Sequence, residues 1–374
     1  MNVSDLKTPL IIAFYLPQYH PFPQNDEWWG KGFTEWTNVG KARPLFRGHY
    51  QPRVPADLGY YDLRLPIIRE QQAQMARDAG VEGFCYWHYW FGNGKTLLSE
   101  IFDEVLTSGK PDFPFCLGWA NHSWTRKNWN AVATGKELDQ TLLKQEYPGD
   151  EDYVNHFFNV LPAFKDKRYI KVDNKPLFVI YRPLSLPDSK HFIYLWNNLA
   201  KENGLEGIHF VGIISGYYPR EFESFFDLGF DGLTFENFRN ITQNMYRGFW
   251  PAKVIRKIRK IFPSLPPEIH DYSKSIKYWL TDYDKQESCY PSILPQWDPS
   301  PRRTHNVLIL KKSTPESFKK HIEEAVKCIE KKSKEHQILF LKSWNEWAEG
   351  NYMEPDIVFG HGYLDALREV IVQE

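Results

Sequence analysis

The stretch Leu10-Ile11-Ile12-Ala13-Phe14-Tyr15-Leu16-Pro17-Gln18-Tyr19-His20 decides between the two folds that the rest of the chain allows. Its first six residues form a short apolar run bounded by prolines, which is typical of a strand buried on both faces of a parallel sheet. A doubly wound sheet would normally continue from such a strand into a glycine-rich turn. A proline and polar or aromatic residues follow here instead, which favours a (β/α)8 barrel.

Strand-like and helix-like segments alternate along the whole chain. Apolar runs predict strands at 10–15, 81–87, 113–119, 176–181, 208–214, 232–235, 290–294 and 337–341. Helices are predicted at 65–79, 97–106, 153–164, 192–202, 221–228, 273–280, 315–331 and 363–372. No linker interrupts the pattern. We therefore expect one α/β domain over residues 1–374, a (β/α)8 TIM barrel with long inserted loops at the C-terminal face of its strands.

Composition excludes several classes of function. The 374 residues carry 46 basic and 47 acidic side chains, and this balance does not suit a nucleic-acid partner. A basic stretch at 247–260 is interpreted as a solvated helix face. No apolar run is long enough to cross a bilayer and no signal peptide is visible, which predicts a cytoplasmic protein, or a periplasmic or secreted one if a leader has been removed. Metal, phosphate-loop and dinucleotide motifs are missing, so we expect no metal and no cofactor.

Residues 344–350 read Trp-Asn-Glu-Trp-Ala-Glu-Gly and follow the last predicted strand. If the turn is helical, Glu346 and Glu349 project toward one side, because residues three apart are neighbours on a helix. Paired carboxyls at about that separation can act on one glycosidic bond. The surrounding indoles suit the apolar faces of sugar rings. We therefore take Glu346 and Glu349 as the candidate catalytic pair.

The ends of the other predicted strands carry aromatic and polar residues, which a barrel gathers at one face. This convergence predicts a sugar-binding site. The candidate contacts are Tyr15, Gln18, Tyr19, His20, Glu35, Trp36, Trp87, His88, Tyr89, Trp119, Asn121, Trp124, Tyr181, Glu236, Trp297, Asp298, Trp344 and Asn345.

Seven segments together resemble the WbsX-type, family 99-like glycoside-acting proteins, distant relatives of the family 99 endo-α-mannosidases. They are residues 14–20, 32–39, 51–62, 83–91, 119–124, 297–303 and 344–350. The resemblance implies a (β/α)8 retaining hydrolase in which Glu346 takes the proton of the substrate 2-hydroxyl and Glu349 acts as acid, then base. Ala348 stands where those mannosidases have histidine, so their preference for α-mannosides is not carried over.

Three functions remain open at this point. The first is a retaining glycoside hydrolase acting on an α-linked polysaccharide or oligosaccharide of the mannose or rhamnose type. The second is a glycosyltransferase or transglycosylase of surface polysaccharide biosynthesis (O-antigen or capsule). The third is a glycan-binding protein without catalytic activity. The sequence leaves open the sugar, the linkage, endo or exo action, and the oligomeric state.

Overall fold

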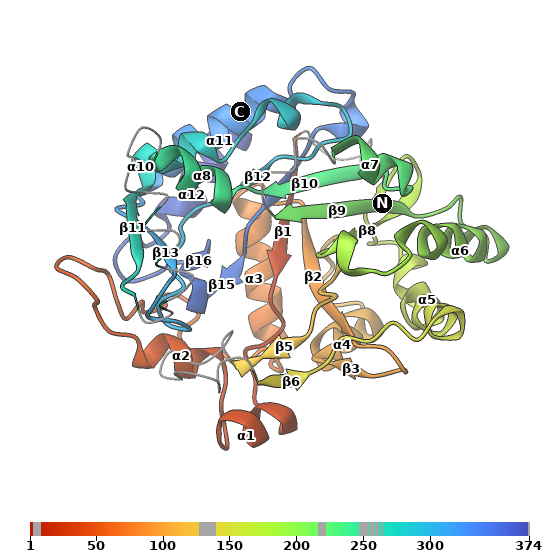
Figure 1. Ribbon diagram of the computed structural model, residues 1–374, viewed down its shortest axis with the longest axis horizontal. Coiled ribbons are helices and arrows are strands. Elements are labelled where there is room, and N and C mark those ends of the chain that lie inside the picture. Colours follow the sequence, from red (N-terminus) through yellow and green to blue (C-terminus); the bar gives the residue numbers. More distant parts are fainter. Residues whose placement is uncertain are drawn as a thin grey trace.

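The computed structural model describes residues 1–2, 9–126, 140–215, 222–246, 254, 258, 262 and 265–372. Its central sheet contains eight parallel strands: β1 (Leu10–Tyr15), β2 (Gly83–Trp90), β4 (Phe115–Trp119), β8 (Lys175–Ile180), β9 (His209–Ser215), β10 (Gly232–Glu236), β12 (Ser292–Ile293) and β14 (Ile338–Leu341). The strands follow one another in chain order, and β14 pairs with β1. A parallel bridge between Leu233 and Cys289 brings β10 against the residues before β12. The predicted barrel is thereby confirmed (Figure 1).

Helices surround the sheet (Figure 1). They are α3 (Pro66–Asp78), α4 (Ser99–Ser108), α5 (Asp150–Phe164), α6 (Ser189–Glu202), α7 (Phe222–Asp227), α8 (Phe238–Met245), α10 (Tyr272–Ser275), α11 (Pro315–Ile329) and α12 (Gly362–Ile371). Most agree with the predicted ranges within a few residues. The helix predicted at 273–280 is shorter, because α10 passes into a 3-10 turn at Ile276–Tyr278. The basic stretch 247–260 lies almost entirely outside the described residues. Among the described helices, none has the length and apolar character needed to cross a bilayer.

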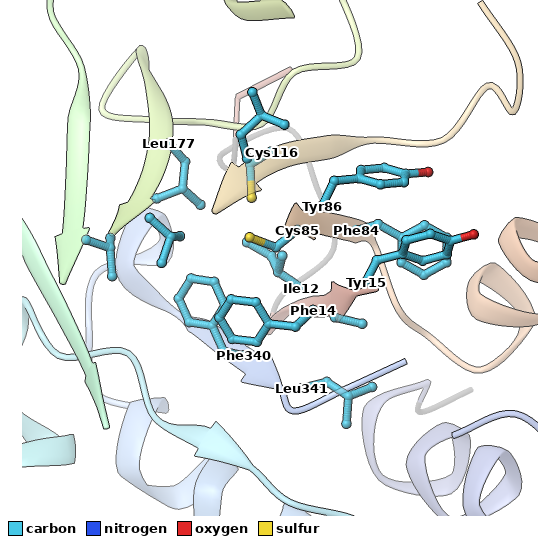
Figure 2. Close-up of a cluster of buried hydrophobic side chains, with 14 of the residues drawn as sticks. Ile12, Phe14, Tyr15, Phe84, Cys85, Tyr86, Cys116, Leu177, Phe340 and Leu341 are labelled. Carbon is cyan, nitrogen blue, oxygen red and sulfur yellow. The ribbon is translucent and has the colours of Figure 1, made fainter. Parts of the chain in front are cut away.

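Side chains alternate between the inside of the barrel and the layer under the helices. Figure 2 shows Phe14, Cys85, Cys116 and Phe340 together on one side of the strands, whereas Tyr15 projects to the other. Both groups are buried, because helices cover the outer face while side chains fill the interior. This two-residue period determines which side chains at the strand ends can reach a central cavity.

The connections after the strands contain further short elements that the sequence did not reveal. Helices α1 (Pro23–Trp29) and α2 (Glu35–Lys41) lie in the long loop after β1. Small ribbons pair β5 (Trp124–Thr125) with β6 (Thr141–Leu143), β11 (Glu268–Asp271) with β13 (Leu308–Lys311), and β15 (Asn345–Glu346) with β16 (Asn351–Tyr352). Strands β3 (Thr96–Leu97) and β7 (Lys171–Val172) pair in antiparallel orientation with β2 and β8, respectively. In Figure 1, α1, α2, β5 and β6 lie on the side toward which β1 and β2 point, as expected for inserted loops at the C-terminal face.

Candidate active site

A cavity of about 120 Å3 opens at the C-terminal ends of the strands. Its lining consists of Leu16, Trp87, Tyr89, Ala120, His122, Trp124, Tyr181, Arg302, Lys342, Glu346 and Glu349. Aromatic rings form much of the wall. The Trp87 indole stacks on Phe14 with ring centroids 4.8 Å apart, and it meets Tyr181 edge-on at 5.5 Å. The cavity therefore offers flat apolar surfaces beside carboxylates and cations, a combination that suits a sugar ring.

The two glutamates reach this cavity because the chain turns sharply after β14. Glu346 ends the short strand β15, and a 3-10 turn at Trp347–Glu349 follows. Gly350 then has φ +53°, a conformation in which residues with a Cβ are strained. A Cβ there would also lie 2.8 Å from the Asp298 Cβ atom. The glycine thus allows the turn that places Glu349 next to Glu346.

One guanidinium holds the acids together. Arg302 donates from Nη1 to Glu349 Oε1 at 2.7 Å and from Nη2 to Glu346 Oε2 at 2.9 Å. Its Nε donates to Glu35 Oε2 at 3.1 Å. Arg302 is buried, so three carboxyl groups share one positive charge in a region that water screens poorly.

This imbalance of charge changes the acidity of the buried carboxyls. Burial raises the pKa of Glu346 to about 8, against the opposing effect of the Arg302 charge. The neighbouring carboxyls of Glu349 and Glu35 raise that pKa further. Burial also raises the pKa of Glu35. At neutral pH the free protein therefore holds a proton on Glu346, because desolvation disfavours the charged form of a carboxyl.

Glu35 supports Arg302 from outside the cavity lining. It is the first residue of α2, and the Thr34 side chain caps this helix by accepting from the Trp36 backbone N–H. The side chain of Glu35 is fully buried and does not line the cavity. Glu35 was expected to bind sugar, but its structural partner is the arginine.

The buried carboxyl of Glu354 binds the indoles of the motif. Glu354 accepts hydrogen bonds from Trp347 Nε1 (2.6 Å), Gln72 Nε2 (2.6 Å), Tyr61 Oη (2.8 Å) and Trp344 Nε1 (3.1 Å). Burial raises its pKa to about 7, and the hydrogen bonds oppose that rise. This network joins the loop after β14 to α3 and to the long loop after β1.

Lys342, which also lines the cavity, forms an ion pair with Glu236 at the end of β10. The other oxygen of Glu236 accepts from Ser215 Oγ at 2.9 Å. Glu236 is also the main reason that the pKa of Tyr181 is raised. Lys342 lines the cavity, but Glu236 does not.

Comparison with known proteins identifies the family. The family model "Glycosyltransferase WbsX" matches residues 11–367. The chain belongs to the WbsX family. Two curated relatives, both called uncharacterized protein WxcX, come from the B100 and ATCC 33913 strains of Xanthomonas campestris pv. campestris. Each is 35% identical over 369 residues, which are 97% of this chain and 50% of the relative. The chain thus spans about half the length of the curated relatives it matches.

Solved structures share the fold of this WbsX family member at low identity. The GH99 endo-α-mannosidase from Bacteroides thetaiotaomicron has 15% identity and a TM-score of 0.54, covering 98% of this chain and 100% of that one. The same enzyme in complex with bis-tris-propane has 15% identity and a TM-score of 0.56, covering 97% of this chain and 98% of that one. A glycoside hydrolase-like protein has 14% identity and a TM-score of 0.56, covering 98% of this chain and 94% of that one. At these identities the likeness concerns the fold alone.

The structure brings only part of the predicted sugar-binding set to the cavity of this WbsX chain. Of the predicted residues, Glu346, Glu349, Trp87, Tyr89, Trp124 and Tyr181 line it. The remainder, which do not, are Tyr15, Gln18, Tyr19, His20, Glu35, Trp36, His88, Trp119, Asn121, Glu236, Trp297, Asp298, Trp344 and Asn345.

For several residues the alternation of the strands explains the difference. Tyr15 points under the helices, where its hydroxyl donates to Gln72 Oε1 at 2.7 Å. Trp119 likewise donates from its indole to the Trp90 carbonyl at 2.9 Å. His88 contacts His156 with their Nε2 atoms 2.9 Å apart.

Other predicted residues shape the loops around the cavity. The side-chain amide of Asn345 binds both backbone groups of Leu16, the residue that follows β1. Its oxygen accepts from Leu16 N at 2.8 Å, and its nitrogen donates to Leu16 O at 3.0 Å. The Tyr19 hydroxyl accepts from Trp347 N at 3.0 Å. Asp298 accepts from Gln51 Nε2 at 2.7 Å. We therefore describe these side chains as supports of the loops.

Further predicted residues pack against other parts of the chain. Trp36 donates from its indole to the Tyr61 carbonyl at 2.7 Å, and the Trp297 ring packs on Phe238 with centroids 4.2 Å apart. His20 is buried with its Nε2 3.9 Å from Glu100. Gln18 is buried too.

Five lining residues were not predicted as site residues: the apolar Leu16 and Ala120, and the polar Arg302, Lys342 and His122. The two-residue period could have indicated Lys342, because it lies two positions after Phe340, which faces the interior. His122 and Arg302 lie in loops, where no period applies. In the described part of the chain, no group of three or more His, Cys, Asp or Glu side chains is placed to hold a metal ion.

Proposed function

We propose that this chain is an enzyme acting on glycans, and specifically a retaining glycoside hydrolase that cleaves an α-linked polysaccharide or oligosaccharide of the mannose or rhamnose type. One observation carries the proposal. Glu346 and Glu349 line the same aromatic-walled cavity at the carboxyl ends of a barrel and are bound to one guanidinium. A (β/α)8 barrel shared with a GH99 endo-α-mannosidase and membership of the WbsX family support it.

The proposed reaction has two steps. Glu346 removes the proton of the substrate 2-hydroxyl, whose oxygen attacks the anomeric carbon and forms an anhydro sugar. Glu349 gives its proton to the leaving oxygen as the glycosidic bond breaks. In the second step Glu349 takes a proton from water, which opens the anhydro sugar, while Glu346 returns the proton to the 2-oxygen. Net retention follows from two inversions at the anomeric carbon.

The charge around the pair supports this chemistry. Such a reaction requires one carboxyl protonated and its neighbour ionised. The raised pKa of Glu346 supplies one proton to the pair at neutral pH in the free protein. For the first step that proton must reside on Glu349 in the substrate complex. A substrate 2-hydroxyl that is hydrogen-bonded to both carboxyls would provide a path for this transfer.

The test compares E346Q and E349Q on two aryl glycosides that differ in leaving group. On the poor leaving group, both variants should lose about 10²–10⁴-fold in kcat/KM. On an activated leaving group, which needs no proton, E349Q should recover much of its activity and E346Q should not. If E346Q recovered activity on the activated substrate and E349Q did not, Glu346 would be the acid and Glu349 the base. If both variants keep near-wild-type turnover on both substrates, the pair is not catalytic.

A second candidate is a glycosyltransferase, because the matching family model carries that description. It would transfer a sugar from a nucleotide-sugar or glycan donor to a sugar acceptor instead of to water. Incubation with GDP-mannose or dTDP-rhamnose and a mannose-type acceptor, followed by mass analysis, distinguishes the two. A larger acceptor would favour transfer, whereas shortened glycans without any donor would favour hydrolysis.

A further inference from the structure

A second cavity adjoins the candidate active site. It has a volume of about 370 Å3 and lies over the ends of β8, β9 and β10. Tyr181 lines both cavities. The Lys342–Glu236 ion pair joins them as well, since Lys342 faces the catalytic cavity and Glu236 faces the second one. We call this second cavity the outer pocket.

The charges around the outer pocket are unequal. Its described lining contains one carboxylate, Glu236, and one guanidinium, Arg182. Glu236 is already engaged by Lys342 and Ser215. The Arg182 side chain, in contrast, is exposed and forms no ion pair with any described residue. A ligand in the outer pocket therefore meets an uncompensated positive charge.

Arg182 is held in place through its backbone. Asn121 accepts from Arg182 N at 2.7 Å and donates to Arg182 O at 2.9 Å. The guanidinium carbon lies 5.6 Å from the centroid of the Tyr181 ring. Its charge also extends toward the catalytic cavity, where His122 has its pKa lowered to about 4 by burial and by Arg182. Among these groups His122 is thus neutral at pH 7, and Arg182 is the free cation at the boundary of the two cavities.

We propose that the outer pocket binds the sugar unit next to the one being cleaved, and that this unit is acidic, with its carboxylate bound by Arg182. A planar guanidinium can pair with a carboxylate through two parallel hydrogen bonds. The volume lies within the range of small-ligand sites. This inference rests on the proposed action on glycans and names the class of glycan as one containing a uronic acid.

The experiment measures binding by calorimetry, so it does not depend on turnover. The probes are α-linked glucuronosyl-mannose and galacturonosyl-mannose disaccharides, each beside its carboxyl-reduced neutral form. GDP-mannose serves as a third probe, because its pyrophosphate could use the same cation. The variants are R182Q and the matched control R239Q, which removes an exposed arginine of α8 that lines neither cavity.

The expected result is that the wild type binds at least one acidic disaccharide about five- to tenfold more tightly than its neutral form, as for a charge-assisted hydrogen bond at a partly exposed site. R182Q should abolish this difference and R239Q should keep it. Equal affinity for both forms, or a difference that survives in R182Q, would overturn the proposal. So would an Arg182-dependent affinity for GDP-mannose alone. None of these results would alter the catalytic test with E346Q and E349Q.

Discussion

Replacing Glu346 by glutamine should stabilise the protein while it removes activity. The pKa of this carboxyl is about 8 in the folded chain, against a reference of 4.5. Such a group stabilises the folded state fully below its unfolded pKa and loses that contribution as pH rises toward the folded pKa. At pH 7 the loss is about 3 kcal/mol, at about 1.4 kcal/mol per pH unit above 4.5. The side chain is only 12% exposed, so water screens little of this effect.

Glutamine has nearly the shape of the protonated acid, and its side-chain oxygen can still accept a hydrogen bond from Arg302. Unlike the acid, it does not ionise between pH 4 and 8. E346Q should therefore unfold at a higher temperature than the wild type at pH 7. An unfolding entropy of about 2.1 cal/mol/K per residue gives about 0.8 kcal/mol/K for this chain, so 3 kcal/mol corresponds to an increase in Tm of about 4 °C. Near pH 4 the two proteins should melt together.

Differential scanning fluorimetry over pH 4 to 8 measures this, with urea unfolding at pH 4.5 and 7 as a second readout. The stabilisation must grow with pH between about 4.5 and 8. A Tm difference that is independent of pH, or a lower Tm for E346Q at pH 7, would show that Glu346 is not held protonated by its surroundings. The reasoning about burial and charge at this cavity would then be wrong.

At pH 4, where the raised pKa of Glu354 has no effect on stability, E354Q should lower the free energy of unfolding by about 3 kcal/mol, because an amide nitrogen would face hydrogen-bond donors and leave some unpaired. Urea unfolding and the near-UV circular dichroism of the tryptophans at this pH test the prediction, and wild-type values for both would contradict it. G350A should cost more stability than G94A, since both glycines have positive φ but only at Gly350 would the new Cβ meet another side chain, that of Asp298. Equal Tm losses for the two variants would show that the turn adjusts freely, and kcat should fall in G350A alone.

The barrel and the acid pair could be predicted because both depend on local sequence. Buried strands are continuous apolar runs, and Glu346 and Glu349 lie three residues apart in the loop that follows β14. The inward or outward direction of an aromatic side chain could not be predicted as safely. Tyr15 has the composition of a site residue, but the register of β1 turns it under the helices.

Local sequence patterns could not predict which residues far apart in the chain contact one another. Arg302 is 267 residues from Glu35 and 44 from Glu346, and no spacing rule connects them. Asn345 resembled a polar contact for a sugar, but it completes the hydrogen bonding of the Leu16 backbone. Only the folded structure shows which polar side chains already form hydrogen bonds or ion pairs within the protein.

The meeting of three separate loops at Arg302 has a consequence for how this architecture can diversify. Glu35 arrives from the loop after β1, Arg302 from the one after β12, and the acids from the one after β14. Loss of the arginine would leave the buried carboxyls of Glu35 and Glu346 and the half-buried carboxyl of Glu349 without their shared cation, and loss of Glu35 would remove one of the three carboxyl groups that hold the arginine. A change at any one of these four residues therefore needs compensation from a loop that is far away in the sequence.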